Sequence, residues 1–151
     1  MRTAYIKNTH PGYTMRHRND DIQMGMNNED HCRPLLESYL KTTLKKNNWN
    51  AVFDFKNENE DIWVELKSRR VNKERYPTTI ITRGKLDFCS DLTKSYYIAF
   101  QFEDGLHIIK YDKELFDTFT FDTNYRRSPR YGASNNIQSV VFIPVSKLTK
   151  I

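Results

Sequence analysis

The stretch 54-DFKNENEDIWVELKSRR-70 decides how this chain folds, because it encodes two strands and the turn that joins them. Side chains of a strand alternate between the two faces of a sheet, so Glu65 and Lys67 share one face and Val64 and Leu66 the other. A strand with one solvated face would display a glutamate and a lysine as ordinary surface residues. What else lies on the Glu65 face therefore decides how the stretch is interpreted.

The turn between these strands determines which residue faces Glu65. If the turn has an even length centred on Asn59-Glu60, Asp54 lies directly opposite Glu65, with Cβ atoms about 4.5–5.5 Å apart. Two such carboxylates repel each other unless a cation lies between them, and Mg²⁺ suits one or two carboxylates, waters and a substrate phosphate. Lys67 points to the same patch, where its ammonium can orient an attacking water or stabilise the charge that develops during phosphodiester cleavage.

A third acidic residue is expected from the preceding helix. The apolar pattern predicts a helix from about Asp30 to Lys46, with Pro34 in or near its first turn and Asn47-Asn48 after its end. Glu37 borders the apolar stripe of that helix, so we predict that it is the third acid. Glu29 is the rival, but it precedes Pro34 and is not expected to be helical.

The rest of the chain predicts an α/β (α+β) fold with a central mixed β-sheet flanked by helices. Residues 1–27 are polar and are expected to form an extended or partly ordered arm, and residues 28–151 a single domain. We expect a second helix over residues 83–92 and leave residues 113–137 unassigned. The expected strands cover residues 49–56, 61–71, 77–81, 96–102, 106–112 and 138–148.

Composition favours an intracellular protein with a nucleic-acid partner. The 151 residues carry a net charge of +5, and the basic residues are clustered beside tyrosines, which suits phosphate contacts and base stacking. The chain has two cysteines outside any CxxC pattern, no apolar leader and no membrane-length apolar run, so we expect no secretion and no membrane partner. The nucleic-acid-binding residues that we predict are Arg69, Arg70, Arg83, Lys85, Arg126, Arg127 and Arg130.

The acidic helix, the aspartate after 51-AVF-53 and the E-x-K strand together resemble the PD-(D/E)XK nuclease superfamily. The resemblance covers about residues 30–110 and is closest to Holliday-junction resolvase-like members. It implies a restriction-endonuclease-like core and one or two Mg²⁺ ions, with Mn²⁺ as a possible substitute. The implied metal ligands are Asp54, Glu65, Glu37 and the carbonyl of Leu66, and Lys67 would serve the attacking water. Phe53 replaces the proline usual before the aspartate, and the segment after Asn124 has no counterpart.

These observations favour a metal-dependent DNA endonuclease, either junction-resolving or of a restriction or homing type. An RNA endonuclease is a second possibility, and a catalytically silent nucleic-acid-binding module on the same fold is a third. A silent module usually lacks one of the acids or the lysine, whereas Asp54, Glu65 and Lys67 are all present. By analogy with enzymes that cut two strands, we expect a homodimer.

Overall fold

The computed structural model describes residues 15–126 and 137–151, and the side chains among them from residue 28 onward. No helix in this part of the chain has the length and apolar character needed to cross a lipid bilayer. The elements, in chain order, are α1 (Met15–Leu40), β1 (Leu44–Lys46), β2 (Phe55–Asn57), β3 (Ile62–Ser68), the 3₁₀ turn η1 (Lys73–Arg75), β4 (Thr78–Thr82), α2 (Arg83–Asp87), β5 (Ser95–Phe102), β6 (Gly105–Lys110), α3 (Lys113–Phe116), β7 (Thr120–Arg126), β8 (Ile137–Pro144), the 3₁₀ turn η2 (Val145–Lys147) and β9 (Thr149–Lys150).

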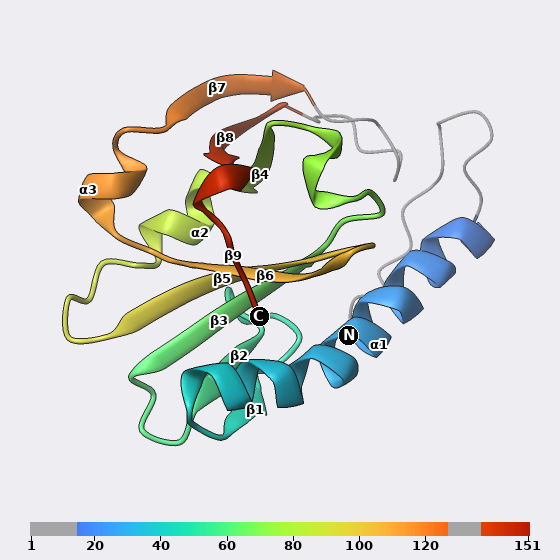
Figure 1. Ribbon diagram of the computed structural model, residues 1–151, viewed down its shortest axis with the longest axis vertical. Helices are drawn as coiled ribbons and strands as arrows, with labels where there is room; N and C mark the ends of the chain where they lie inside the picture. The colour runs from blue at the N-terminus through green and yellow to red at the C-terminus, as the bar shows by residue number, and fades with distance from the viewer. Residues whose placement is uncertain (1–14, 127–136) are drawn as a thin grey trace.

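The strands form two sheets that stack on each other (Figure 1). The larger sheet has the order β1-β2-β3-β5-β6-β9, in which β3 and β5 are parallel and the other neighbours are antiparallel. The smaller sheet is antiparallel, with the order β4-β8-β7. The predicted α+β class with a mixed central sheet is therefore confirmed. The second sheet was not predicted.

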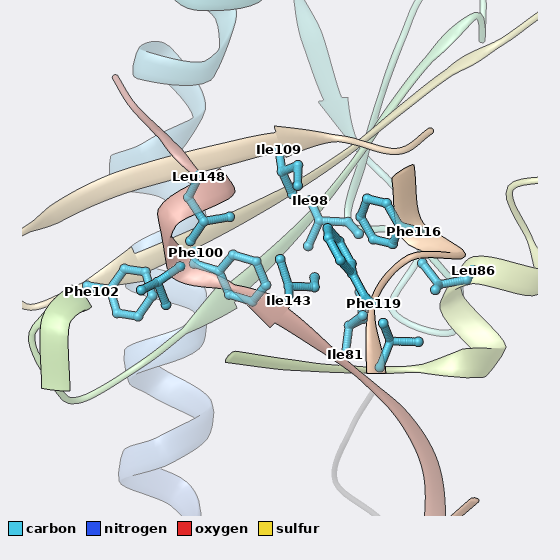
Figure 2. Close-up of a cluster of buried hydrophobic side chains, with 12 residues drawn as sticks. Ile81, Leu86, Ile98, Phe100, Phe102, Ile109, Phe116, Phe119, Ile143 and Leu148 are labelled. Carbon is cyan, nitrogen blue, oxygen red and sulfur yellow. The ribbon is translucent and has the colours of Figure 1, made fainter. Parts of the chain in front are cut away.

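The two faces of the larger sheet are covered by different elements. Helix α1 packs on one face, where Cys32 and Leu36 meet the apolar side of β3 at Val64 and Leu66. The smaller sheet, α2 and α3 cover the other face, and Figure 2 shows the buried cluster between them, with Phe100 of β5 at its centre. Glu65 lies on this second face, because it alternates with Val64 and Leu66 along β3.

Helix α1 differs from the prediction at both ends. It includes residues 15–27, which were expected to be an extended arm, and it ends at Leu40 rather than near Asn47. Pro34 lies in the helix interior on its exposed side, where the helix continues through it. Lys41, at φ +56°, reverses the chain into β1, so residues 44–46 are a strand and not helix. Residues 1–14 lie outside the described residues, and the single domain over residues 28–151 stays a prediction.

The β2–β3 hairpin has the predicted register, although its strands are shorter than expected. Phe55 pairs with Val64 and Lys56 with Trp63, and the same register carried one residue further places Asp54 opposite Glu65. The turn is closed by Glu60 at φ +58°. Residues 49–54 form a bend rather than the start of the strand, and Trp49 in it is 60% exposed.

The second half of the chain largely follows the prediction. Strands β4 and β5 and the β5–β6 hairpin lie where they were expected. Helix α2 covers only Arg83–Asp87, five residues fewer than the expected helix over residues 83–92. The unassigned residues 113–137 contain α3 and β7, and β8 pairs with both β4 and β7.

Candidate active site

Glu65 is a buried carboxylate in the middle of β3. Its side chain is 3% exposed, and its Oε2 atom contacts the ammonium groups of Lys67 at 3.0 Å and Lys85 at 3.1 Å. Its Oε1 atom is buried and receives no hydrogen bond from any described residue. Burying a carboxylate is costly unless its oxygens are paired. Glu65 is thus half satisfied: two ammonium groups contact Oε2, and no donor from the described residues contacts Oε1.

Asp54 lies beside Glu65 at the point where β2 separates from β3. Its Oδ2 atom accepts a hydrogen bond from the Leu66 backbone N–H at 2.8 Å, and its own N–H donates to the Val64 carbonyl at 3.1 Å. Burial, followed by the negative charge of Glu65, raises the pKa of Asp54 to about 7. When protonated, Asp54 can also donate a hydrogen bond to the Glu65 carboxylate, which raises the pKa further. Ionisation of both carboxylates is therefore unfavourable unless a cation lies between them.

Lys85 joins this site from α2, which follows β4 directly. Besides Glu65, its ammonium donates a hydrogen bond to the carbonyl of Val52 in the bend before Asp54. We predicted Lys85 as a phosphate-binding residue, and the structure instead places it against the buried acid. The connection between the parallel strands β3 and β5 must cross one face of the sheet, and it crosses the Glu65 face. No local sequence pattern around Lys85 indicates this contact, because the contact depends on that crossing.

The two glutamates of α1 lie in different surroundings. The negative charge of Glu29 contributes to the raised pKa of Asp54, and the Glu29 carboxylate is 3.7 Å from the ammonium of Lys46. The Glu37 carboxylate instead accepts a hydrogen bond from the Leu44 backbone N–H at 2.8 Å, where it holds the turn between α1 and β1. The structure therefore brings Glu29, rather than the predicted Glu37, toward the carboxylate pair. The error follows from the helix start, because α1 already includes residue 29.

A family model described as phage putative PDDEXK endonuclease matches residues 15–151. The chain belongs to this family. Among curated proteins, none matches it. Family membership confirms the resemblance to the PD-(D/E)XK nucleases, and the mixed sheet between α1 and the smaller sheet is consistent with a restriction-endonuclease-like fold.

The donor set of this PD-(D/E)XK site fits a divalent metal ion. Among the described residues, no three acidic, histidine or cysteine side chains already converge as a metal cluster. The fit rests instead on Glu65 Oε1, a buried oxygen to which no described residue donates, and on the adjoining Asp54 carboxylate. The Leu66 carbonyl adds a third oxygen: the N–H and C=O of one strand residue point the same way, and the Leu66 N–H points at Asp54. Oxygen donors of this kind suit Mg²⁺ or Mn²⁺.

The predicted nucleic-acid contacts of this PD-(D/E)XK protein fall into three groups. Arg69 is engaged within the fold: its guanidinium donates to Thr79 Oγ1 at 3.1 Å and to the Ile80 carbonyl at 2.8 Å, which ties β3 to β4. Arg70, Arg83 and Arg126 are exposed, and the Arg83 guanidinium lies 4.8 Å from the centre of the Phe121 ring. Arg127 and Arg130 lie outside the described residues.

Proposed function

We propose that this chain is a metal-dependent endonuclease that hydrolyses phosphodiester bonds in DNA. The observation that carries the proposal is Glu65, whose buried Oε1 atom has no donor among the residues that the structure describes and lies beside a second carboxylate. Buried polar atoms in native proteins are nearly always satisfied, and a bound cation explains this exception. Membership in an endonuclease family supports phosphodiester hydrolysis as the chemistry.

In this proposal Asp54, Glu65 and the Leu66 carbonyl hold the ion, and Glu29, rather than Glu37, is the acid of α1 that supports these ligands. A bound Mg²⁺ would polarise the scissile phosphate and lower the pKa of a water molecule. Lys67 lies on the same face of β3 as Glu65 and is about one-third exposed, so its ammonium can meet both the acid and an incoming substrate. We assign Lys67 to orienting the attacking water.

Lys85 supplies a second positive charge to the same acid. Its side chain is 22% exposed, less than that of Lys67, and it is held between Glu65 and the Val52 carbonyl. A cation held in this way balances the buried charge and stabilises negative charge that develops nearby during the reaction. We therefore propose that Lys85 positions the Glu65 carboxylate and that Lys67 faces the substrate.

DNA is the proposed substrate because the chain is basic overall and exposes arginines on α2 and β7. Cutting both strands of a duplex requires two such sites, so we propose that two copies of the chain act as a homodimer. Sedimentation of the protein with and without duplex DNA checks this stoichiometry.

The decisive experiment is a cleavage panel with Mg²⁺ or Mn²⁺ on duplex, junction, flap and single-stranded DNA and on matching RNA. We expect metal-dependent cutting of DNA that Glu65→Gln abolishes and that Glu58→Gln, a matched change at the exposed hairpin tip, leaves intact. Lys67→Ala should be nearly inactive, and Lys85→Ala should lose less activity than Lys67→Ala. Cutting of RNA alone would favour the RNA endonuclease, and no cutting by the wild type would favour a silent binding module.

A further inference from the structure

A cleft of about 510 Å³ lies beyond the carboxylate site, between the end of β3 and the smaller sheet. Its walls come from the β3–β4 connection and from β4, β7 and β8, and none of Asp54, Glu65, Lys67 or Lys85 lines it. It begins at Arg69, which lies on the Glu65 face of β3 and, at about 3.3 Å per residue, roughly 13 Å from Glu65 along the strand. The cleft is therefore within reach of a nucleotide a few positions from a bond cut at Glu65.

The cleft combines an apolar floor with a polar rim. Phe102, Phe142 and Val145 provide apolar surface, and Arg70 and Lys73 provide positive charge at the edge. A volume of this size is within the roughly 300–1,000 Å³ of sites that bind small ligands. Apolar side chains do not stabilise a charged phosphate. A nucleotide presents both a flat base, which can pack on the floor, and a phosphate, which can contact the rim.

Two tyrosines of the cleft differ in how they are held. The Tyr125 ring packs edge-on against Phe142, with ring centres 5.8 Å apart, so it forms a fixed wall. Tyr76 follows η1 and is 54% exposed, with the Arg75 guanidinium 5.2 Å from its ring centre. An exposed aromatic ring beside cations is the arrangement on which single-stranded nucleic acids stack their bases.

The cleft is built on a stiff base. Arg69 bridges β3 and β4 through Thr79 and the Ile80 carbonyl, and its guanidinium lies 5.4 Å from the centre of the Phe100 ring. Because these contacts join the two sheets, the cleft does not depend on a ligand to keep its walls apart. Arg69 thus serves the cleft as a brace rather than as the phosphate contact that we predicted.

We propose that this cleft binds one unpaired nucleotide of the DNA strand that is being cut, with its base stacked on Tyr76. The inference rests on the proposed nuclease function and adds a substrate class to it. A base within a duplex must be unstacked and unpaired before it enters a cleft, which costs a few kcal/mol, so a nucleotide that is already unpaired binds without that cost. The preferred substrate is therefore DNA with an unpaired nucleotide a few positions from the scissile bond.

The test measures binding of the full chain by fluorescence anisotropy, in chelator and at one salt concentration, to two DNAs. One is a blunt duplex, and the other is the same duplex with a single bulged nucleotide. We expect the wild type to bind the bulged DNA at least about 10-fold more tightly, and Tyr76→Ala to lose most of that preference while keeping its affinity for the blunt duplex. Tyr39→Ala, a matched change at a 46% exposed tyrosine on α1 that does not line the cleft, should keep the preference.

Two results would overturn the proposal: equal affinity of the wild type for both DNAs, or a preference that Tyr76→Ala leaves unchanged. If the cleft holds only phosphates, Lys73→Ala should weaken binding to both DNAs alike, and Tyr76→Ala should have no effect. The same two DNAs incubated with Mn²⁺ keep the two proposals apart. Cleavage without a bulge preference rejects the cleft alone, and a bulge preference without cleavage rejects the nuclease function alone.

Discussion

The two ends of the β2–β3 hairpin treat buried polar groups in opposite ways. At the tip, the Asn57 side chain is 5% exposed and fully engaged: its Oδ1 accepts from the backbone N–H groups of Asp61 and Ile62, and its Nδ2 donates to Asp61 Oδ1. At the base, Glu65 Oε1 is buried with no donor in the described part of the chain, and Asp54 has a raised pKa. A buried polar network whose hydrogen bonds are all formed stabilises the fold, whereas a buried oxygen without a donor is available to bind a ligand.

The largest effect is expected from a substitution at the base of the β2–β3 hairpin. Asp54→Asn removes one of the two carboxylates at the base of the hairpin. It should lower cleavage at least about 10³-fold, since metal-assisted charge stabilisation contributes several kcal/mol. Folding, followed by far-ultraviolet circular dichroism, should be unaffected. The rate is measured in single-turnover cleavage assays with Mn²⁺. Activity within tenfold of wild type would remove Asp54 from the proposed site.

The second largest effect separates the two glutamates of α1. Glu29→Ala should reduce cleavage about 10–100-fold, the usual range for a residue that supports a metal ligand, with little change in stability. Glu37→Ala should leave cleavage nearly unchanged but lower the free energy of unfolding by about 1–2 kcal/mol, because the Leu44 N–H loses its acceptor. Both variants are compared in cleavage assays and urea denaturation. The reverse pattern would restore Glu37 as the helix acid.

A substitution at the tip of the hairpin should lower stability and leave cleavage activity unchanged. Asn57→Ala leaves two partly buried backbone N–H groups without their acceptor, which costs about 1–3 kcal/mol. For a chain of this size that lowers the melting temperature by about 2–10 °C. Residual activity of the folded variant, measured well below its melting temperature, should match the wild type. The control is Asn59→Ala at an exposed position of the same turn.

The sequence was sufficient to predict what depends on short-range periodicity. The pairing of Asp54 with Glu65 was predicted from the alternation along β3 and the turn length, and the register confirms it. Helix α1 was misplaced because its first half is polar and because Pro34 suggested a helix start. That error concealed Glu29, since a residue outside a helix cannot be assigned to a helix face.

Features that depend on contacts between distant segments were not predictable. The smaller sheet pairs β4 with β8, which are separated by most of the second half of the chain, and nothing local in either strand specifies the partner. Lys85 reaches Glu65 only because α2 follows β4 across the Glu65 face. The role of Arg69 as a brace has the same origin, because its acceptors lie on β4.

The smallest effect that distinguishes base from tip is on stability as a function of pH in the metal-free protein. The pKa of Asp54 is raised from 3.8 to about 7, so the folded state holds its proton more tightly than the unfolded state. Its contribution to stability is therefore fully present below pH 3.8 and is lost as the pH rises through about 7. Asparagine does not titrate, so in chelator Asp54→Asn should lose less stability than the wild type between about pH 5 and pH 8.

Urea denaturation at these two pH values, with and without Mg²⁺, measures the effect. Mg²⁺ should raise the stability of the wild type at pH 8 more than at pH 5, because the ion competes with the Asp54 proton. It should do little for Asp54→Asn. Asn57→Ala is the internal control: it should be less stable than the wild type by the same amount at both pH values, since neither asparagine nor alanine titrates. If the wild type and Asp54→Asn showed the same dependence on pH, the crowding of the two carboxylates would not be a property of the folded state. The contrast between base and tip would then rest on the unsatisfied Glu65 oxygen alone.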